Sequence, residues 1–306
     1  MALGGLVLKH NPSISMDEEE LFISQKEVRV RYRFTNHAAH DITTLVSFPL
    51  PDVPRGINAT PGDQLMPDFR KLGFVTTVDG RPVKLDYVER AHVGRRDVTA
   101  RLQALGWPLR WYVDYPDQAA FIDRLSPARQ AAFQSEGLLH RGGWQGAPLQ
   151  PAWNIITHVT RQQLFPAGRP IIVTHRYVPL AGGSVGGNLD KRARNEAFFA
   201  SHTRTYCYDA AFLAAFDRRQ ARKASDGSSP TYVEHWLSYI LKSGNNWRGP
   251  IGRFRLVIDK GDPGNLASFC MAGVSKISPT RFEVVKRNFT PKRDLDILIV
   301  EWPKPE

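Results

Sequence analysis

One segment of this sequence fits the pattern of a serine nucleophile. Residues 182–186, Gly-Gly-Ser-Val-Gly, match G-x-S-x-G, which places a catalytic serine between a strand and a helix. His175, His202 and Asp190 are near enough in sequence to be considered as triad partners of Ser184. More glycine follows the motif where a helix would have to begin. A plain glycine loop is therefore the favoured interpretation, and a hydrolase using Ser184 is the alternative.

A second segment could bind anions. Residues 28–34 read Val-Arg-Val-Arg-Tyr-Arg-Phe, so Arg29, Arg31 and Arg33 alternate with apolar residues. Successive side chains of a strand point to opposite faces, and the three arginines therefore share one face. We predict that they contact an acidic glycan, a lipid head group or an acidic protein. The simpler alternative is a solvated basic face.

The overall charge is consistent with either interpretation. The chain has 306 residues and a formal net charge of +11 at pH 7. Such a balance favours contact with polyanions, although a charge spread over most segments can also serve solubility alone. No signature of a DNA- or RNA-binding module accompanies the arginines, so we do not expect nucleic acid as a partner.

Metal and cofactor motifs are absent from the sequence. His37 and His40 are three residues apart in a polar turn, and two histidines are too few to define a metal site. The sequence contains no H-E-x-x-H, paired C-x-x-C or EF-hand pattern, and no glycine loop of the P-loop or dinucleotide type. We predict no metal and no cofactor.

The chain has two cysteines, Cys207 and Cys270. They could form one disulfide in an oxidising compartment or be two unrelated buried thiols. The sequence leaves these two alternatives open.

The elements that would position these residues are mostly strands. Residues 28–51 predict a β-hairpin that turns at residues 36–40 and ends at paired prolines. The acidic run at residues 17–20 is interpreted as an exposed turn that a capping box begins. Residues 233–241 carry apolar side chains at i, i+3, i+4, i+7 and i+8, which predicts an amphipathic helix.

These elements predict an α+β fold that is mainly an antiparallel β-sandwich. We assign residues 1–92 and 151–182 to the sandwich, residues 93–150 to a helical insertion, and residues 183–306 to a C-terminal α+β portion packed on the sandwich. No apolar run approaches the roughly 20 residues that a membrane-spanning helix needs. Met1 directly precedes a strand-like segment, as after removal of a leader.

Motifs along nearly the whole chain resemble the bacterial family called domain of unknown function 4424 (DUF4424). They are residues 5–8, 14–24, 28–32, 43–51, 246–260, 268–270 and 289–295. The resemblance implies an exported protein of the Gram-negative periplasm, made with a leader, and supplies no catalytic residues. A looser similarity of fold is to the vault and inter-α-trypsin type of β-sandwich, in which a strand ending in Asn likewise precedes one ending in Phe-Pro-Leu-Pro.

Together these observations favour a non-catalytic binding or interaction module of the bacterial envelope. The alternative from a different class is a hydrolase of an envelope polymer that uses Ser184.

Overall fold

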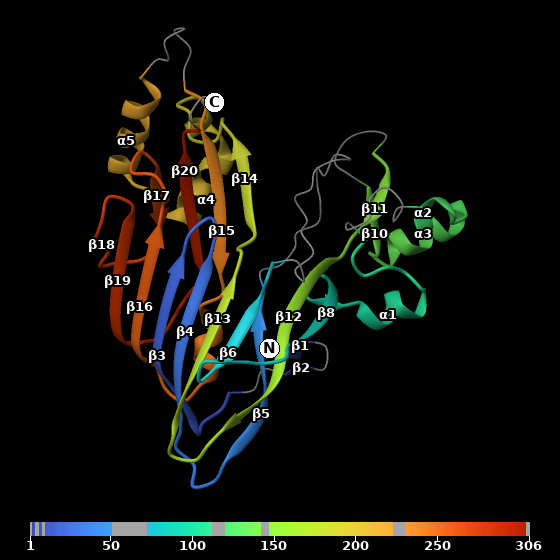
Figure 1. The fold of residues 1–306 in the computed structure, drawn as a ribbon. Helices are drawn as coiled ribbons and strands as arrows, with labels where there is room; N and C mark the ends of the chain where they lie inside the picture. The colour runs from blue at the N-terminus through green and yellow to red at the C-terminus, as the bar shows by residue number, and fades with distance from the viewer. Residues whose placement is uncertain are drawn as a thin grey trace. The chain divides into compact units, whose positions relative to one another are not determined.

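The computed structural model describes residues 2–3, 6–7, 10–50, 72–111, 120–141, 147–222 and 230–303. The chain divides into two compact units, each built from several segments (Figure 1). Unit 1 comprises residues 1–9, 44–72 and 84–163, and unit 2 comprises residues 10–43, 73–83 and 164–306. Segments that we predicted to form one sandwich contribute to both units, and the division into three parts stays a prediction.

The fold is α+β and mainly antiparallel β, as the sequence predicted. Unit 2 contains an eight-stranded sheet whose neighbours are antiparallel except for one parallel pair, β16 and β3. Figure 1 shows strands from both halves of the chain side by side in this sheet. Its strands, in spatial order, are β18 (Ser275–Lys276), β19 (Arg281–Phe289), β16 (Ile251–Asp259), β3 (Ile14–Ile23), β4 (Val28–Asn36), β13 (Pro170–Tyr177), β6 (Val75–Val78) and β7 (Arg81–Pro82).

Strand β4 has the two faces that its sequence predicts. Val28, Val30, Tyr32 and Phe34 are buried, and the alternating arginines are partly or fully exposed. The predicted hairpin is wrong, however. Strand β5 (Ile42–Pro49) pairs with β12 (Asn154–Phe165) in another sheet. The reason is that β3 and β13 already occupy the two edges of β4, so no edge is left for β5.

The acidic run at residues 17–20 lies inside β3, so the predicted exposed turn with a capping box is also wrong. Glu18 and Glu20 lie opposite Arg33 and Arg31 in the antiparallel register of β3 and β4. Opposite charges on facing positions of neighbouring strands stabilise the pairing. The run is therefore extended because its partner strand is basic, which no local pattern indicates.

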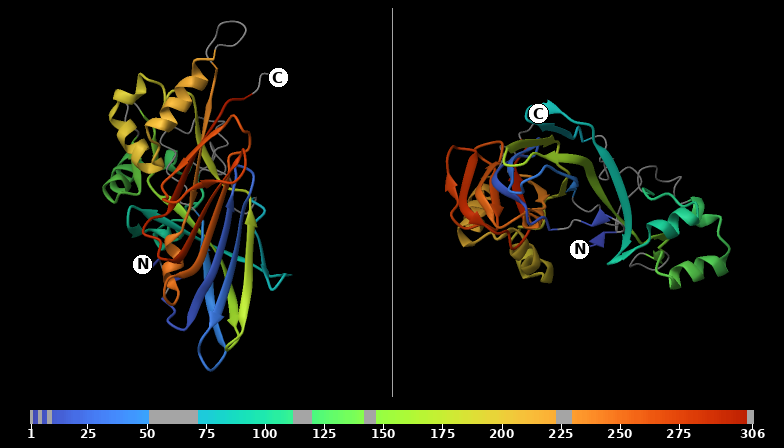
Figure 2. Two further views of the ribbon diagram at one scale, coloured as in Figure 1. Left: turned by 90° about the vertical axis from the view of Figure 1, so that its left-hand side faces the viewer. Right: turned by 90° about the horizontal axis from the view of Figure 1, so that it is seen from below.

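Unit 2 has a second sheet of four strands, in the order β14 (Ala181–Val185), β15 (Val233–Tyr239), β20 (Leu295–Glu301) and β17 (Leu266–Phe269). Helices α4 (Ala197–Tyr206) and α5 (Ala210–Gln220) cover one face of it (Figure 2). The core beneath them includes Tyr206, Phe216 and Leu298. Two 3-10 helices, Ala193–Asn195 and Lys242–Asn246, complete the helical elements of unit 2 among the described residues.

The amphipathic helix that we predicted at residues 233–241 is strand β15. Trp236 packs toward the helix-covered core, whereas Leu237 is buried on the opposite face. β15 lies between β14 and β20 and has both faces covered. A strand that is apolar on both faces lacks a clean alternation, and its pattern then also fits a helix.

A buried acid lies where the two sheets of unit 2 face each other. Glu19 on β3 is only 2% exposed. Tyr239 on β15 donates a hydrogen bond to Glu19 Oε1 at 3.3 Å, and the hydroxyl oxygens of Tyr239 and Tyr32 are 2.6 Å apart. Burial raises the pKa of Glu19 to about 8, and the bond from Tyr239 only partly opposes this shift. Glu19 is therefore mostly protonated at neutral pH.

Unit 1 contains a four-stranded sheet and a helical subdomain. The sheet order is β5, β12, β8 (Asp86–Val93) and β9 (Arg96–Asp97). The remaining elements of unit 1 are α1 (Thr99–Ala104), α2 (Ala120–Asp123), α3 (Pro127–Ser135), β10 (Leu139–Arg141), β11 (Leu149–Pro151), β1 (Ala2–Leu3) and β2 (Leu6–Val7). At the start of α3, the side chain of Ser126 accepts a hydrogen bond from the backbone N–H of Arg129 and caps the helix. Trp107 and Trp153 stack in the core of this subdomain.

The two cysteines form a disulfide in the structure. Cys207 follows α4 and Cys270 follows β17, with their Cα atoms 5.0 Å apart. The bond therefore ties the end of a covering helix to the sheet beneath it.

We expect Glu19→Gln to change the pH dependence of stability. The folded-state pKa of Glu19 lies above the ordinary value of 4.5, so the wild-type protein loses stability as the pH rises from about 4.5 to about 8. One group contributes at most about 1.4 kcal/mol per pH unit to this slope. In urea unfolding across this window, the variant should lose less stability than the wild type. Parallel curves for the two proteins would contradict the burial of an ionisable group.

We expect the double variant Cys207→Ser/Cys270→Ser to be less stable than the oxidised wild type. The bond spans 63 residues, and the chain-entropy model gives about 4 kcal/mol for closing a loop of that length. Urea unfolding of both proteins, with wild type in dithiothreitol as a control, measures the difference. A loss below about 1 kcal/mol would show that the disulfide constrains the unfolded chain far less than the model predicts.

Candidate anion-binding groove

A groove on the outer face of the eight-stranded sheet of unit 2 encloses about 440 Å³. Four arginines and two glutamates provide its charged side chains. The lining residues are Glu20, Leu21, Phe22, Glu27, Arg29, Arg31, Thr174, Arg255, Val257, Ile277 and Arg281. They come mainly from β3, β4, β16, β19 and β13, so the groove runs across neighbouring strands.

Strand register brings these side chains together. Phe22 lies opposite Arg29, and Glu20 lies opposite Arg31, in the pairing of β3 with β4. The parallel pairing of β3 with β16 sets Arg255 beside Glu20. Facing residues of neighbouring strands point to the same side of a sheet. Rows of alternating charge therefore cross the outer face.

Ion pairs connect the rows. Arg31 lies 3.2 Å from Glu18, measured between Nη1 and Oε2. Arg255 and Arg281 lie 2.8 Å from carboxylate oxygens of Glu283 and Asp259. Each of these pairs holds a long side chain in place, and exposed pairs of this kind contribute only about 0 to 1 kcal/mol to stability.

The arginines of these pairs reach further into solvent than the carboxylates. The side chain of Arg29 is 53% exposed and that of Glu27 is 23% exposed. The corresponding fractions are 51% for Arg281 and 16% for Asp259. In these two pairs the arginine is therefore more exposed than its carboxylate, whereas Glu20, which also lines the groove, is 35% exposed against 40% for Arg31.

The floor of the groove is partly apolar. Phe22 lies on β3 near the middle of the groove, and Val257 is beside it on β16. The guanidinium carbon of Arg29 is 5.1 Å from the centre of the Phe22 ring, and that of Arg281 is 5.8 Å from it. Both distances are within the range of cation–π interactions. The ring therefore helps to position two of the four arginines.

Two of the three arginines that we predicted from sequence line the groove, and the third does not. Arg29 and Arg31 line the groove, whereas Arg33 lies further along the same face of β4, outside the lining. Their binding role stays a prediction. Sequence reasoning missed Arg255 and Arg281, although the alternation in residues 253–257 was a usable signal. The parallel pairing of β16 with β3, which joins segments more than 200 residues apart, brings Arg255 to the groove, and the pairing of β19 with β16 then brings Arg281.

Ser184 lies in strand β14 (Ala181–Val185), so the predicted glycine loop is wrong over residues 182–185. Its hydroxyl donates a hydrogen bond to the carbonyl oxygen of Gly186 at 3.1 Å. β14 pairs antiparallel with β15, and no helix begins directly after the serine, as a nucleophile elbow requires. Position 183 favours glycine because a Cβ atom there would lie 2.5 Å from the carbonyl oxygen of Glu234, which is too close for a side chain.

The structure does not assemble the candidate triad. His202 Nε2 lies 3.2 Å from Glu234 Oε2, and its Nδ1 lies 3.0 Å from the hydroxyl of Tyr208. His175 Nδ1 is 2.7 Å from the hydroxyl of Thr76, in the eight-stranded sheet. Within the described part of the chain, no histidine nitrogen forms a hydrogen bond with Ser184. A base for the serine is therefore missing from this geometry.

The remaining sequence candidates are the histidines considered as metal ligands and any membrane-spanning helix. His37 Nε2 lies 2.8 Å from the hydroxyl of Ser15, a contact between two surface groups. Among the described residues, no three His, Cys, Asp or Glu side chains are arranged to hold a metal ion. Over the same residues, no helix is both long enough and apolar enough to cross a membrane.

Comparison with known proteins connects the whole chain to one family. The search of curated proteins found no match. A solved structure from Legionella pneumophila, for which nutrient binding has been suggested, aligns over 95% of this chain and 68% of its own, with 15% identity and a TM-score of 0.43. An M1 zinc metallopeptidase from Deinococcus radiodurans aligns over 95% of this chain and 43% of its own, with 8% identity and a TM-score of 0.26.

At these scores neither structure supports an argument about function. The likeness to vault and inter-α-trypsin sandwiches stays a prediction. The family model described as "Domain of unknown function (DUF4424)" matches residues 1–298, and the chain therefore belongs to the DUF4424 family.

Proposed function

We propose that this protein is a non-catalytic binding module whose arginine groove holds an anionic ligand. The observation that carries the proposal is the set of four arginines that line the groove, of which Arg29 and Arg281 have side chains about half exposed and more exposed than their paired carboxylates. Arginine is well suited to this role because its planar group donates several hydrogen bonds to a carboxylate or phosphate. The anchoring carboxylates hold the groups in position and reduce the entropy lost when a ligand binds.

The cellular location of this protein and the class of its ligand are part of the proposed function. We place the protein in the periplasm of a Gram-negative bacterium, where the ligand is an anionic component of the envelope or an acidic protein. A disulfide between Cys207 and Cys270 supports an oxidising compartment. Nucleic acid is not proposed, because an exported protein would rarely meet it.

A hydrolase using Ser184 is not favoured by any observation in the structure. The hydroxyl of Ser184 is bonded to a backbone carbonyl, and both ring nitrogens of His202 face other groups. Activation of a serine needs a base within hydrogen-bond reach.

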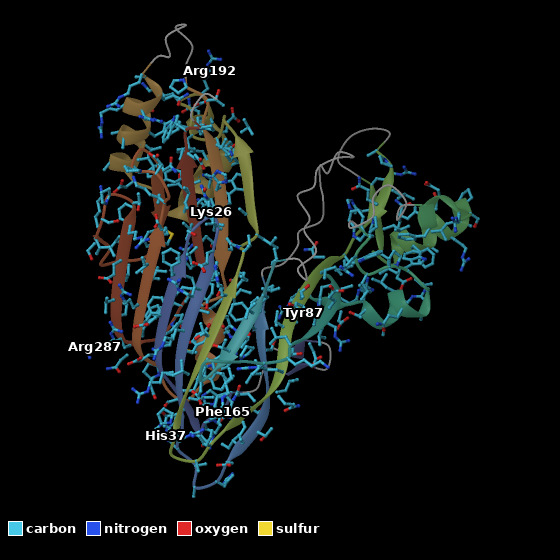
Figure 3. The ribbon with its side chains drawn as sticks, viewed as in Figure 1. Lys26, His37, Tyr87, Phe165, Arg192 and Arg287 are labelled. Atoms are coloured by element: carbon cyan, nitrogen blue, oxygen red, sulfur yellow. A yellow bond between two sulfur atoms is a disulfide. The ribbon has the colours of Figure 1, made fainter. Side chains whose placement is uncertain are left out.

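Two double variants test the groove. Arg29→Gln/Arg31→Gln removes two charges from it, and Arg33→Gln/Arg287→Gln removes two from outside it. Arg287, labelled in Figure 3, lies on the same strand as Arg281. We expect wild type to bind short-chain inorganic polyphosphate in calorimetric titration at about 20 mM NaCl. Binding should weaken at about 200 mM NaCl, because salt screens exposed charges.

The groove variant should bind polyphosphate at least about tenfold more weakly than wild type, and the control variant within about twofold of it. An equal loss in both variants would assign binding to net charge and would overturn the proposal. Absence of wild-type binding at low salt would overturn it as well.

We expect Ser184 to remain unmodified by a fluorophosphonate probe at about pH 7.5, because no histidine in the described part of the chain bonds to its hydroxyl. Mass spectrometry of the treated protein measures the modification, with a known serine hydrolase as the positive control. Labelling of Ser184 in wild type, lost in Ser184→Ala, would instead support the hydrolase.

A further inference from the structure

Two arginines of the groove lie on either side of one aromatic ring. Arg29 comes from β4 and Arg281 from β19, and β3, which carries Phe22, lies between those strands in the sheet. The guanidinium carbons are 5.1 and 5.8 Å from the ring centre. Two cations that are each held at cation–π distance from one ring are therefore no more than about 11 Å apart.

Both guanidinium groups keep donors for a ligand. Arg281 uses Nε for its hydrogen bond to Asp259 Oδ2, at 2.8 Å. Arg29 lies 3.6 Å from Glu27, a carboxylate that Arg176 approaches to 2.5 Å. An arginine has five N–H donors in a planar fork, so one carboxylate does not occupy it. The two side chains are each about half exposed.

The surface between these two cations is apolar. Phe22 and Val257 form it, and Ile277, which is 47% exposed, lines the same groove. An apolar group placed on this surface would bury nonpolar area, at roughly 25 cal/mol for each Å² removed from water.

We propose that the ligand of this groove carries two anionic groups joined by a short apolar linker. One anionic group binds Arg29, the other binds Arg281, and the linker covers Phe22. The inference rests on the proposed function and adds a requirement for two charges at a defined separation. The anionic groups are carboxylates or phosphates, which arginine recognises in the same geometry.

A series of probes of increasing length tests this requirement. We would titrate the protein with α,ω-alkanedicarboxylates of about four to twelve carbons and with the monocarboxylates of matching length. A parallel series of alkane bisphosphonates distinguishes the two kinds of anionic group. One intermediate dicarboxylate or bisphosphonate should bind at least about tenfold more tightly than its singly charged counterpart, because binding at the second arginine is then intramolecular.

Single variants assign the two ends of the ligand. Arg281→Gln should reduce the affinity for the best doubly charged probe to that of the matching singly charged probe, and Arg29→Gln should do the same. Arg287→Gln, an exposed residue of the same strand as Arg281, is the matched control and should leave the affinity within about twofold of wild type.

The outcomes separate this inference from the proposed function. If polyphosphate binding depends on Arg29 and Arg31 but doubly charged probes of every length bind no better than singly charged ones, the inference is wrong and the binding module stands. If Arg281→Gln leaves the preference for the doubly charged probe unchanged, the inference is also wrong. If neither polyphosphate nor any probe binds, both proposals fail.

Discussion

The pairing of β3 with basic strands on both of its edges is the constraint on which the outer face of unit 2 depends. β4 pairs with β3 in antiparallel register and β16 pairs with it in parallel register. Glu18 and Glu20 are thereby placed between arginines from segments at opposite ends of the chain. Like charges on facing positions of neighbouring strands are destabilising, and the acidic residues of β3 separate the arginines of β4 from those of β16. At the outer edges of these three strands, Arg29 faces Arg176 on β13 and Arg253 faces Arg287 on β19.

The same strand has a different chemistry on its inner face. Glu19 is buried against Tyr239 and keeps its proton at neutral pH, because desolvation disfavours its charged form. Burial of this acid costs stability at neutral and alkaline pH, whereas the exposed ion pairs of the outer face contribute little. Stability therefore does not account for the accumulation of arginines. The side chains of Arg29 and Arg281 are about half exposed, and the function that we propose rests on this exposure.

The success of sequence reasoning differed between elements for identifiable physical reasons. The two faces of β4 were predicted correctly because one face is buried and the other is solvated, which produces a period of two. β15 was mistaken for a helix because it is covered on both faces and lacks that period. β5 was assigned to a hairpin because a polar turn precedes it, although both edges of β4 are occupied. In the candidate site, Arg29 and Arg31 were identified from their alternation. Arg281 could not be identified in this way, since its position in the groove depends on the order of β19, β16 and β3 in the sheet.

The sequence by itself determined which side chains share a face of a strand, that the fold is mainly antiparallel β, and that the chain resembles the DUF4424 family. These properties follow from local periodicity and from motifs, both of which are readable along the chain. The tertiary structure alone decided which strands are neighbours, and therefore that Phe22 lies between Arg29 and Arg281. It also decided that no histidine nitrogen bonds to Ser184 among the described residues. Strand pairing over more than 200 residues depends on the edges left open by the other strands, and that information is not local.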